Sequence, residues 1–460
     1  MSSNQYHLGD TICAIATAAG IGAIGVLRVS GPNAISLVNQ LFVGSNLEKV
    51  ASHTLHFGKI MDGTNTVDEV LASVFVAPKS YTGEHTIELS CHGSPYIQQR
   101  ILELLVSQGA RLAKPGEFTL RAFLNKKLDL TQAEAVADLI ASHSEMSHKT
   151  AMNQMRGGFS KEIAQVKERL VNFASLIELE LDFSEEDVEF ASRPALRELV
   201  QKILSLINAL TQTFKMGNAI KNGVPTVIVG KPNAGKSTLL NALVKDDRAI
   251  VSSIAGTTRD TIEEVFVIEG ILFRLIDTAG IRAHTEDVIE SIGIEKTHEK
   301  IKQASIVLYL FDALETTAAD LEEEIAKLSL EGSVLVPIAN KIDLAAGQNL
   351  AEKFSGRTDI LYLSSKEQSG LQELHHRLRE IVLKDQGAND VIISNVRHYQ
   401  SLMHAAESLQ NVLNSMEIGR SGELLAFDIR KSIHHLAEII GEVSTDDLLE
   451  NIFSKFCIGK

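Results

Sequence analysis

Hydrophobic positions follow two different periods along this 460-residue chain. Up to about residue 125, short apolar runs alternate with polar positions and are separated by Gly and Pro, a pattern typical of strands mixed with short helices. The predicted strands cover 12–17, 24–29, 54–61, 69–76 and 86–90, and the predicted helices cover 34–41, 95–108 and 115–124. Strands and helices mixed in this way predict a small α+β domain over 1–125.

From Lys126 onward, apolar residues recur every three or four positions, which is the helical period. Three helices between 126 and 219 carry apolar faces so broad that they need further helical partners. The same period returns near the end of the chain, at 396–416, at 422–440 and after a cap near Ser444–Asp447. We therefore expect one all-α helical domain that is discontinuous, with parts at 126–219 and 385–460.

The first helix of this domain carries a start signal and an apolar stripe. Thr131 and Glu134 have the spacing of a capping box. Ala133, Val136, Ile140 and His143 fall on one helical face. This predicts a helix that begins at Thr131 and reaches His143.

The block at 220–384 alternates strands and helices, which predicts an inserted α/β domain whose ends lie close together. Its first strand ends in Gly230-Lys-Pro-Asn-Ala-Gly-Lys-Ser237, a loop that cradles nucleotide phosphates. Gly230 and Gly235 allow close backbone approach, Lys236 reaches the β- and γ-phosphates, and Ser237 can bind Mg²⁺. The block therefore reads as a P-loop nucleotide-binding domain.

Four shorter motifs follow this loop in order. They are Ala255–Asp260, whose Thr258 can close over the γ-phosphate and bind Mg²⁺, Asp277–Gly280, Asn340–Asp343 and Ser364–Lys366. Asp343 decides the base, because its carboxylate can accept two hydrogen bonds from guanine that adenine cannot offer. ATPases and kinases lack this Asn-Lys-x-Asp element, so the set predicts a GTPase.

The residue that activates water is not evident from the motifs. Ras-like GTPases use a glutamine after the metal-binding motif, but this chain has Ile281 there, and an aliphatic side chain cannot orient water. Candidates lie in the following acidic run, Glu286, Asp287, Glu290 and Glu295. Asn233 inside the loop could instead help by holding a monovalent cation beside the phosphates.

Composition narrows the class of protein. The net charge of −15 argues against a protein that coats nucleic acid non-specifically, since such binding needs Lys and Arg. Cys13, Cys91 and Cys457 form neither a disulfide framework nor a metal cluster, which favours a reducing, cytoplasmic location. The uncharged run at 11–27 lacks a basic start and divides into two strands, so we expect neither a signal peptide nor a membrane anchor.

Over essentially its whole length the chain resembles the bacterial tRNA uridine-34 modification GTPases of the MnmE (TrmE) family. The likeness rests on Val26–Gly31, Tyr81–Glu84, Lys114–Asn125, Lys127–Leu130, the five GTPase motifs and the tail Phe456–Lys460. The chain departs from the family at Thr17–Ala23, where two prolines and an arginine are missing. Taken one by one, polar residues such as Glu84, Glu88 and Arg121 would be expected at turns or on the surface.

The resemblance implies a multidomain fold: a folate-binding and dimerising N-terminal α+β domain, the split helical domain, and an inserted Ras-like P-loop G domain. It also implies GTP, Mg²⁺, K⁺ and 5-formyl- or methylene-tetrahydrofolate as ligands. The folate residues by position are Arg28, Glu88, Lys127 and Lys460. The implied Mg²⁺ ligands are Ser237 and Thr258, and the implied K⁺ ligands are Asn233, Ser252, Ile254 and Thr257.

The implied catalytic residue is Glu290, although a one-residue gap before it leaves Glu286 and Asp287 open. The implied GTP-binding residues are Asn233, Ala234, Gly235, Lys236, Ser237, Thr238, Ser252, Ser253, Ile254, Ala255, Gly256, Thr257, Thr258, Asp277, Thr278, Ala279, Gly280, Asn340, Lys341, Asp343, Ser364, Ser365 and Lys366. By resemblance the protein is a homodimer whose G domains pair in K⁺.

The resemblance further implies a complex with the FAD-dependent partner MnmG, as a heterotetramer or larger assembly. This complex adds a carboxymethylaminomethyl or aminomethyl group to C5 of the wobble uridine of certain tRNAs. Two other readings of the motifs remain open, a ribosome-assembly GTPase and an interaction switch without a small-molecule site.

Overall fold

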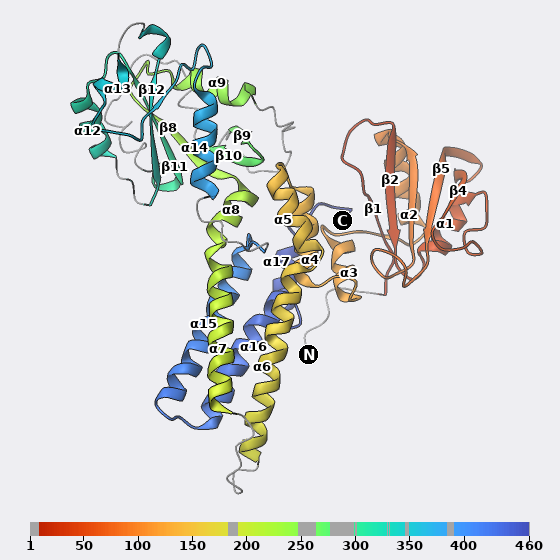
Figure 1. Ribbon diagram of the computed structural model, residues 1–460. Coiled ribbons are helices and arrows are strands. Elements are labelled where there is room, and N and C mark those ends of the chain that lie inside the picture. The colour runs from red at the N-terminus through yellow and green to blue at the C-terminus, as the bar shows by residue number, and fades with distance from the viewer. Residues whose placement is uncertain are drawn as a thin grey trace. The chain divides into compact units, whose positions relative to one another are not determined.

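The computed structural model describes residues 9–182, 192–246, 264–276, 299, 301–328, 330, 332–345, 349–383 and 391–459 (Figure 1). The chain divides into two compact units. Unit 1 comprises Met1–Ile140, Met152–Val200 and Glu407–Lys460, and unit 2 comprises Ala141–Ala151 and Gln201–Ala406. Within the described ranges, no helix is both long and apolar enough to cross a membrane.

Unit 1 begins with a seven-stranded sheet in the order β3-β4-β5-β6-β2-β1-β7. The strands are β1 Ile12–Ile15, β2 Ile24–Ser30, β3 Phe42–Val43, β4 Thr54–Asp62, β5 Asn65–Phe75, β6 Thr86–His92 and β7 Arg111–Leu112. Neighbours are antiparallel except β1 and β7, which are parallel. The five predicted strands are confirmed, whereas β3 and β7 were missed because two residues are too short to show a period.

Three helices accompany this sheet, and all three were predicted. They are α1 Ala34–Leu41, α2 Pro95–Ser107 and α3 Glu117–Leu124. Side chains of α1 and α2, such as Val38 and Ile101, are buried with Leu27 and Leu89 of the sheet in one core. Helices packed against a mostly antiparallel sheet make this region an α+β domain.

The helical part of the chain comprises α4 Leu130–Ile140, α5 Glu145–Met155, α6 Gly158–Asp182, α7 Arg193–Gln212, α15 Val396–Glu417, α16 Gly422–Ile440 and α17 Asp446–Phe453. Helix α6 buries Ile163, Val166 and Leu170, and it runs beside α16 although their sequences lie far apart (Figure 1). Glu178 of α6 accepts a hydrogen bond of 2.5 Å from Arg430 of α16. The two stretches of helical sequence therefore pack together, as their broad apolar faces require.

The predicted start and end of α4 were wrong. Asp129, not Thr131, caps the helix: its carboxylate accepts from Gln132 N at 2.9 Å, and Gln132 Oε1 accepts from Asp129 N at 3.0 Å. Thr131 lies inside the helix with its hydroxyl donated to Asp129. His143 lies beyond the helix, which ends at Ile140. An Asp two positions earlier offers the same cap chemistry, so spacing alone could not choose between them.

Unit 2 contains a six-stranded sheet in the order β13-β12-β11-β8-β10-β9. The strands are β8 Val224–Val229, β9 Glu264–Ile268, β10 Ile271–Leu275, β11 Ile306–Asp312, β12 Val334–Asn340 and β13 Leu361–Tyr362. All neighbours are parallel except β9, which is antiparallel to β10. Sequence reasoning overlooked β11, a central strand whose seven residues are all buried.

Helices cover both faces of this sheet. The helices are α8 Phe214–Asn222, α9 Lys236–Asp246, α12 Ala318–Lys327, α13 Leu350–Lys353 and α14 Leu371–Leu383. Leu239 of α9 and Leu374 of α14 belong to one core, while Leu321 of α12 packs into a second core. A mostly parallel sheet between two helical layers is the doubly wound α/β arrangement, and it places strand ends at one edge where ligands bind.

The chain enters and leaves this α/β block at neighbouring points. Ile393 N donates a hydrogen bond of 3.0 Å to the Thr213 hydroxyl, although the two residues are 180 positions apart. Gly217 lies against the same segment, since a Cβ there would come within 2.2 Å of Ile393 O. Adjacent entry and exit points are what an inserted domain requires.

Candidate functional site

The loop after β8 has a backbone that only glycine can adopt at two positions. Gly230 has φ +152° and Gly235 has φ +100°. A Cβ on Gly230 would lie 2.0 Å from Leu310 O, and one on Gly235 would lie 2.3 Å from Asn340 Nδ2. The loop is therefore pressed against β11 and β12, and this close approach explains both glycines.

Lys236 is the first residue of α9, and its side chain folds back over the loop. Its Nζ donates to Gly230 O at 2.7 Å and to Lys231 O at 2.9 Å. Burial lowers the pKa of the Lys236 ammonium. A cation held above backbone N–H groups at the start of a helix makes a site for phosphate oxygens. Ser237 and Thr238 follow in the first turn of α9.

Asn340, at the end of β12, joins the loop to the last of the motifs, Ser364–Lys366. Its Nδ2 donates to Ala234 O at 2.8 Å, and its Oδ1 accepts from Ser365 N at 2.9 Å and from the Ser365 hydroxyl at 3.0 Å. The side chain is 2% exposed. Hydrogen bonds thus join segments that are more than a hundred residues apart in the sequence. Both the nitrogen and the oxygen of the Asn340 side-chain amide take part.

Asp343 is fixed by the same segment. Its Oδ1 accepts a hydrogen bond of 2.6 Å from the Ser364 hydroxyl, and that hydroxyl in turn accepts from Glu367 N at 3.1 Å. Lys366 lies on the surface, with its side chain 76% exposed. A carboxylate held at this edge of the sheet is placed to accept hydrogen bonds from a planar base.

Asp312, which sequence reasoning missed, fixes Lys341. Lys341 has φ +65°, and its Nζ lies 2.8 Å from Asp312 Oδ2. Burial alone would raise the pKa of Asp312, but the Lys341 ammonium and the backbone N–H groups of Leu314 and Glu315 outweigh it, so the pKa is lowered. The signal in the sequence was the apolar run at 306–311, which ends in this aspartate.

Asn233 lies at the tip of the loop in the left-handed region, with φ +64°. Asparagine tolerates this conformation better than most residues. The other predicted K⁺ ligands and the Mg²⁺ ligand Thr258 lie outside the described residues, together with the predicted catalytic residue and the C-terminal lysine. These residues are Ser252, Ser253, Ile254, Ala255, Gly256, Thr257, Thr258, Asp277, Thr278, Ala279, Gly280, Ile281, Glu286, Asp287, Glu290, Glu295 and Lys460. Within the described part of the chain, no group of three or more His, Cys, Asp or Glu could hold a metal.

A second polar site lies in unit 1, on the seven-stranded sheet. Arg28 and Glu88 are partners across β2 and β6, and Arg28 Nε donates to Glu88 Oε1 at 2.9 Å. The guanidinium lies 5.5 Å from the ring centre of Tyr81 and 5.6 Å from that of Phe118. Arg28 Nη1 also lies 3.5 Å from Gly459 O, so the C-terminal tail reaches this pair.

Lys127 contacts the loop that contains Pro78, Tyr81 and Gly83, and not the Arg28–Glu88 pair itself. Its Nζ donates to Pro78 O at 3.1 Å, and its side chain lies against Gly83. Tyr81, which covers Arg28, belongs to this loop. The structure therefore brings Arg28, Glu88 and the tail together directly and brings Lys127 to the loop that lines them.

Arg121 is the centre of a buried ion-pair network, so the expectation of a surface residue was wrong. It is 1% exposed and pairs with Asp10 at 2.5 Å, Glu84 at 3.1 Å and Glu117 at 3.1 Å. A buried arginine persists when carboxylates surround it, and no periodic pattern reveals such a partner set. The network fixes the Tyr81–Glu84 loop beside Arg28.

Known proteins match the whole chain. The family described as "MnmE helical domain" matches residues 130–457, and the family described as "GTP-binding protein TrmE N-terminus" matches residues 11–127. A tRNA modification GTPase MnmE of Christiangramia forsetii is 54% identical, over 98% of this chain and 100% of the relative. Another, of Cytophaga hutchinsonii, is 52% identical over 98% of each chain.

Among solved structures, the G domain of the T. maritima FeoB iron transporter is 24% identical, with a TM-score of 0.25, over 35% of this chain and 98% of that chain. The full-length relatives carry the assignment. This chain belongs to the MnmE family of tRNA modification GTPases.

Proposed function

We propose that the protein binds and hydrolyses GTP as part of a tRNA-modifying complex. The observation that carries this proposal is the Asn340 bridge, which ties the loop at Ala234 to the segment at Ser365 that we propose faces the guanine base. The bridge sets the distance between the place for phosphates and the carboxylate of Asp343. Family membership supplies the second support, because the relatives are named tRNA modification GTPases.

The test of base recognition is Asp343→Asn. The amide has an NH₂ donor group where the carboxylate has a second acceptor oxygen, so it cannot accept both hydrogen bonds from guanine. It can pair with xanthine, which carries a carbonyl in place of the 2-amino group. We expect GTP affinity to fall by about 10³-fold and XTP to bind about as well as GTP binds the unchanged protein. Titration with fluorescent nucleotides measures both.

The matched control is Asp359→Asn, which changes a surface aspartate paired with Arg357 in the same unit. It should leave both affinities within about twofold. Unchanged GTP binding in Asp343→Asn would disprove recognition of guanine by this carboxylate.

Residues of the phosphate loop and of the segments that follow it suit two cations that would assist GTP hydrolysis. We propose that Ser237, in the first turn of α9, and Thr258 hold Mg²⁺, which would neutralise charge on the β- and γ-phosphates. We propose that Asn233 holds K⁺ together with Ser252, Ile254 and Thr257, and its position at the loop tip beside the phosphate cradle supports this. With Ile281 at the usual glutamine position, Glu290 is proposed to orient the attacking water.

Replacing Glu290 tests that assignment. Glu290→Ala should slow GTP hydrolysis by about 10²- to 10⁴-fold while GTP affinity stays within about twofold, because the group acts on water rather than on the nucleotide. Single-turnover phosphate release measures the rate. Glu286→Ala and Asp287→Ala are the matched variants, and a loss in either of them with full activity in Glu290→Ala would move the role.

The second site supports a folate ligand. We propose that 5-formyl- or methylene-tetrahydrofolate binds where Arg28, Glu88 and Lys127 lie, with Lys460 contributing from the tail. The cross-strand guanidinium and carboxylate could bond the polar edge of a pterin, and Tyr81 and Phe118 supply flat apolar surfaces. When bound, the folate would supply a one-carbon unit.

The wider assignment follows from the family. We propose that the protein is a cytoplasmic homodimer that acts with an FAD-dependent partner, MnmG, to modify C5 of the wobble uridine of tRNA. The proposed folate site would favour this assignment over a ribosome-assembly GTPase or a simple switch, neither of which needs a small-molecule site. Absence of folate binding in calorimetry would favour the simple switch.

A further inference from the structure

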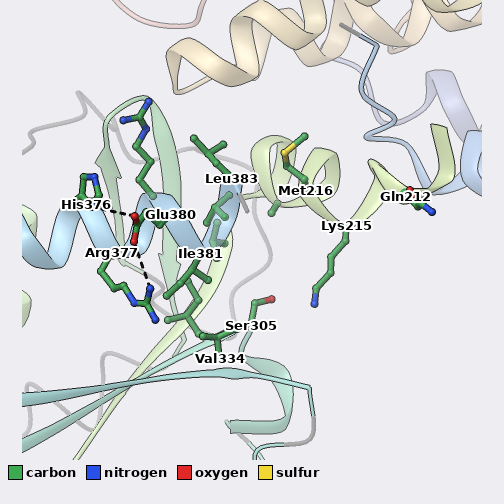
Figure 2. Close-up of a pocket in the computed structure, with 15 residues that line it drawn as sticks. Gln212, Lys215, Met216, Ser305, Val334, His376, Arg377, Glu380, Ile381 and Leu383 are labelled. Atoms are coloured by element: carbon green, nitrogen blue, oxygen red, sulfur yellow. Dashed lines mark hydrogen bonds and ion pairs between the residues drawn. The ribbon is translucent and has the colours of Figure 1, made fainter. Parts of the chain in front are cut away.

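A cavity of about 650 Å³ lies in unit 2 at the edge of the six-stranded sheet opposite the nucleotide loops (Figure 2). Its volume is in the range of small-molecule sites. The first residues of β8, β11 and β12 line it, together with one side of α8 and the last two turns of α14. The sequence motifs and the proposed function leave this cavity without a role.

The floor of the cavity is apolar. Val224, Ile306 and Val334 open the three strands, and Met216 and Ile381 face them from α8 and α14. Ile306 and Val334 are register partners in adjacent strands, so this floor is continuous. Val334 is 39% exposed although it opens a strand of the central sheet. Covering it would be favourable by the ordinary hydrophobic effect.

The charged rim of the cavity is unbalanced. Arg377 Nη1 lies 3.5 Å from Glu380 Oε2, and Arg379 Nη1 lies 3.0 Å from Glu269 Oε2. His376 shares Glu380 at 3.7 Å. Lys215 has no ion pair or hydrogen bond from its side chain to any residue that the structure describes. Two arginines are matched by two glutamates, so the positive charge of Lys215 remains.

A hydroxyl accompanies this cation. Ser305 uses its backbone in the sheet, donating from N to Pro225 O at 2.8 Å and accepting at O from Val334 N at 2.9 Å. Its side-chain oxygen has no hydrogen bond to the described residues. Figure 2 shows the polar ends of Lys215 and Ser305 directed toward each other across the cavity, away from the His376–Glu380–Arg377 group. An ammonium and a hydroxyl above an apolar floor match an anionic group on an apolar body.

We infer that this cavity is a binding site for a small amphipathic anion, with one carboxylate, sulfonate or phosphate between Lys215 and Ser305 and an apolar body on the strand ends. Occupancy is coupled to the nucleotide site, because the same elements form both. The strands that open at the cavity end beside the nucleotide loops, β8 before Gly230, β11 at Asp312 and β12 at Asn340. Helix α14 likewise starts just after the segment that holds Asp343. Two ligands that bias the same rigid elements change each other's affinity by the same factor.

The test uses 8-anilinonaphthalene-1-sulfonate, an aromatic sulfonate that fluoresces in apolar sites, with the full chain saturated in GDP. We expect saturable binding to one site with a Kd on the order of tens of micromolar for a probe of this size. Lys215→Glu should weaken it at least tenfold, and Ala219→Trp, which fills the cavity from α8, should remove it. Lys49→Glu makes the same charge change at an exposed lysine of unit 1 and should leave binding within twofold.

Three results would overturn the inference. They are equal probe binding in Lys215→Glu and the unchanged protein, full competition by GDP, and binding at many sites without saturation. If Ala219→Trp fails to fold, Lys215→Glu still decides. The coupling is measured separately, as a change of threefold or more in GDP affinity when the probe is saturating. The measurement of coupling rests on the proposed nucleotide site, whereas the measurement of probe binding does not. Either can therefore fail without the other.

Discussion

The nucleotide edge of the six-stranded sheet, where the phosphate loop, Asn340 and Asp343 lie, differs from the Arg28 site on the seven-stranded sheet. The two sites draw their residues from the sequence in different ways. At the first, each group sits at the end of a strand inside a short contiguous motif, and Asn340 joins the motifs through three hydrogen bonds. At the second, a cross-strand pair meets a tail residue 431 positions away. The first site depends on local backbone geometry, and the second depends on the assembled fold of unit 1.

The largest effect should come from breaking the backbone geometry of the first site. In Gly235→Ala the new Cβ would lie 2.3 Å from Asn340 Nδ2, at a backbone φ of +100°. Asn340 must then leave Ala234 O and lose a buried hydrogen bond. We expect GDP affinity to fall by about 100-fold or more and the free energy of unfolding to fall by about 1–3 kcal/mol. Nucleotide titration and urea unfolding measure the two losses.

Gly356→Ala is the control, because nothing lies within 4 Å of its Cβ position and its φ is not in the positive range. It should change neither quantity appreciably. If Gly235→Ala bound GDP normally, the loop would not depend on close packing against Asn340, and the contrast between local and assembled sites would weaken.

Ligand binding at the second site should depend on the single side chain of Arg28. Arg28→Ala removes the partner of Glu88, the cation between the rings of Tyr81 and Phe118, and the contact with Gly459. We expect binding of 5-formyltetrahydrofolate to weaken by about 10- to 100-fold, since a hydrogen bond to a charged group is lost and Glu88 is left unpaired. GTP turnover should be unchanged. Calorimetry and a phosphate-release assay separate the two.

Arg100→Ala is the control, because Arg100 is an arginine of the same unit that lies in helix α2. Arg100 pairs with Asp62 and Glu103 on the surface of the same unit. Its removal should leave folate binding within about twofold. An equal loss in both variants would point to general damage to the domain.

The smallest expected effect is a pH-dependent loss of stability when Asp312 is replaced. The pKa of Asp312 is lowered in the folded protein, because Lys341 and two backbone N–H groups outweigh its burial. Its contribution is therefore present above the unfolded pKa of about 4 and is lost as pH falls through the lower folded value. Asp312→Asn should reduce the free energy of unfolding by about 0.5–1.5 kcal/mol at pH 7 and by less near pH 3. Urea unfolding at both pH values measures this, and an equal loss at both would contradict it.

The same contrast explains what the sequence could predict. Strands such as β2 and helices such as α1 and α16 were located because their apolar periods are local, and the phosphate loop was found because its glycines and lysine are contiguous. Asp312 was missed although it ends a visible apolar run, because no nearby residue marks Lys341 as its partner. The burial of Arg121 was invisible, since its carboxylates come from three separate segments.

The cap of α4 shows the limit at shorter range. Asp129 and Thr131 both offer an oxygen, and in the structure Asp129 accepts from Gln132 N and from the Thr131 hydroxyl. Spacing alone could not settle a difference of two residues. The same helix ends at Ile140 although no Gly or Pro follows it closely in the sequence.

The pairing of α6 with α16 has a consequence for the order of events during synthesis. Helix α16 begins at Gly422, about 240 residues after α6 ends at Asp182. At ~5–20 residues per second, the apolar face of α6 waits roughly 12–48 s on the ribosome for its partner. The last helix of the α/β block between them, α14, ends at Leu383, 39 residues before α16 begins. For most of that wait the α/β block is still being synthesised while the apolar face of α6 lacks its partner, and this is the interval in which chaperones have most to protect.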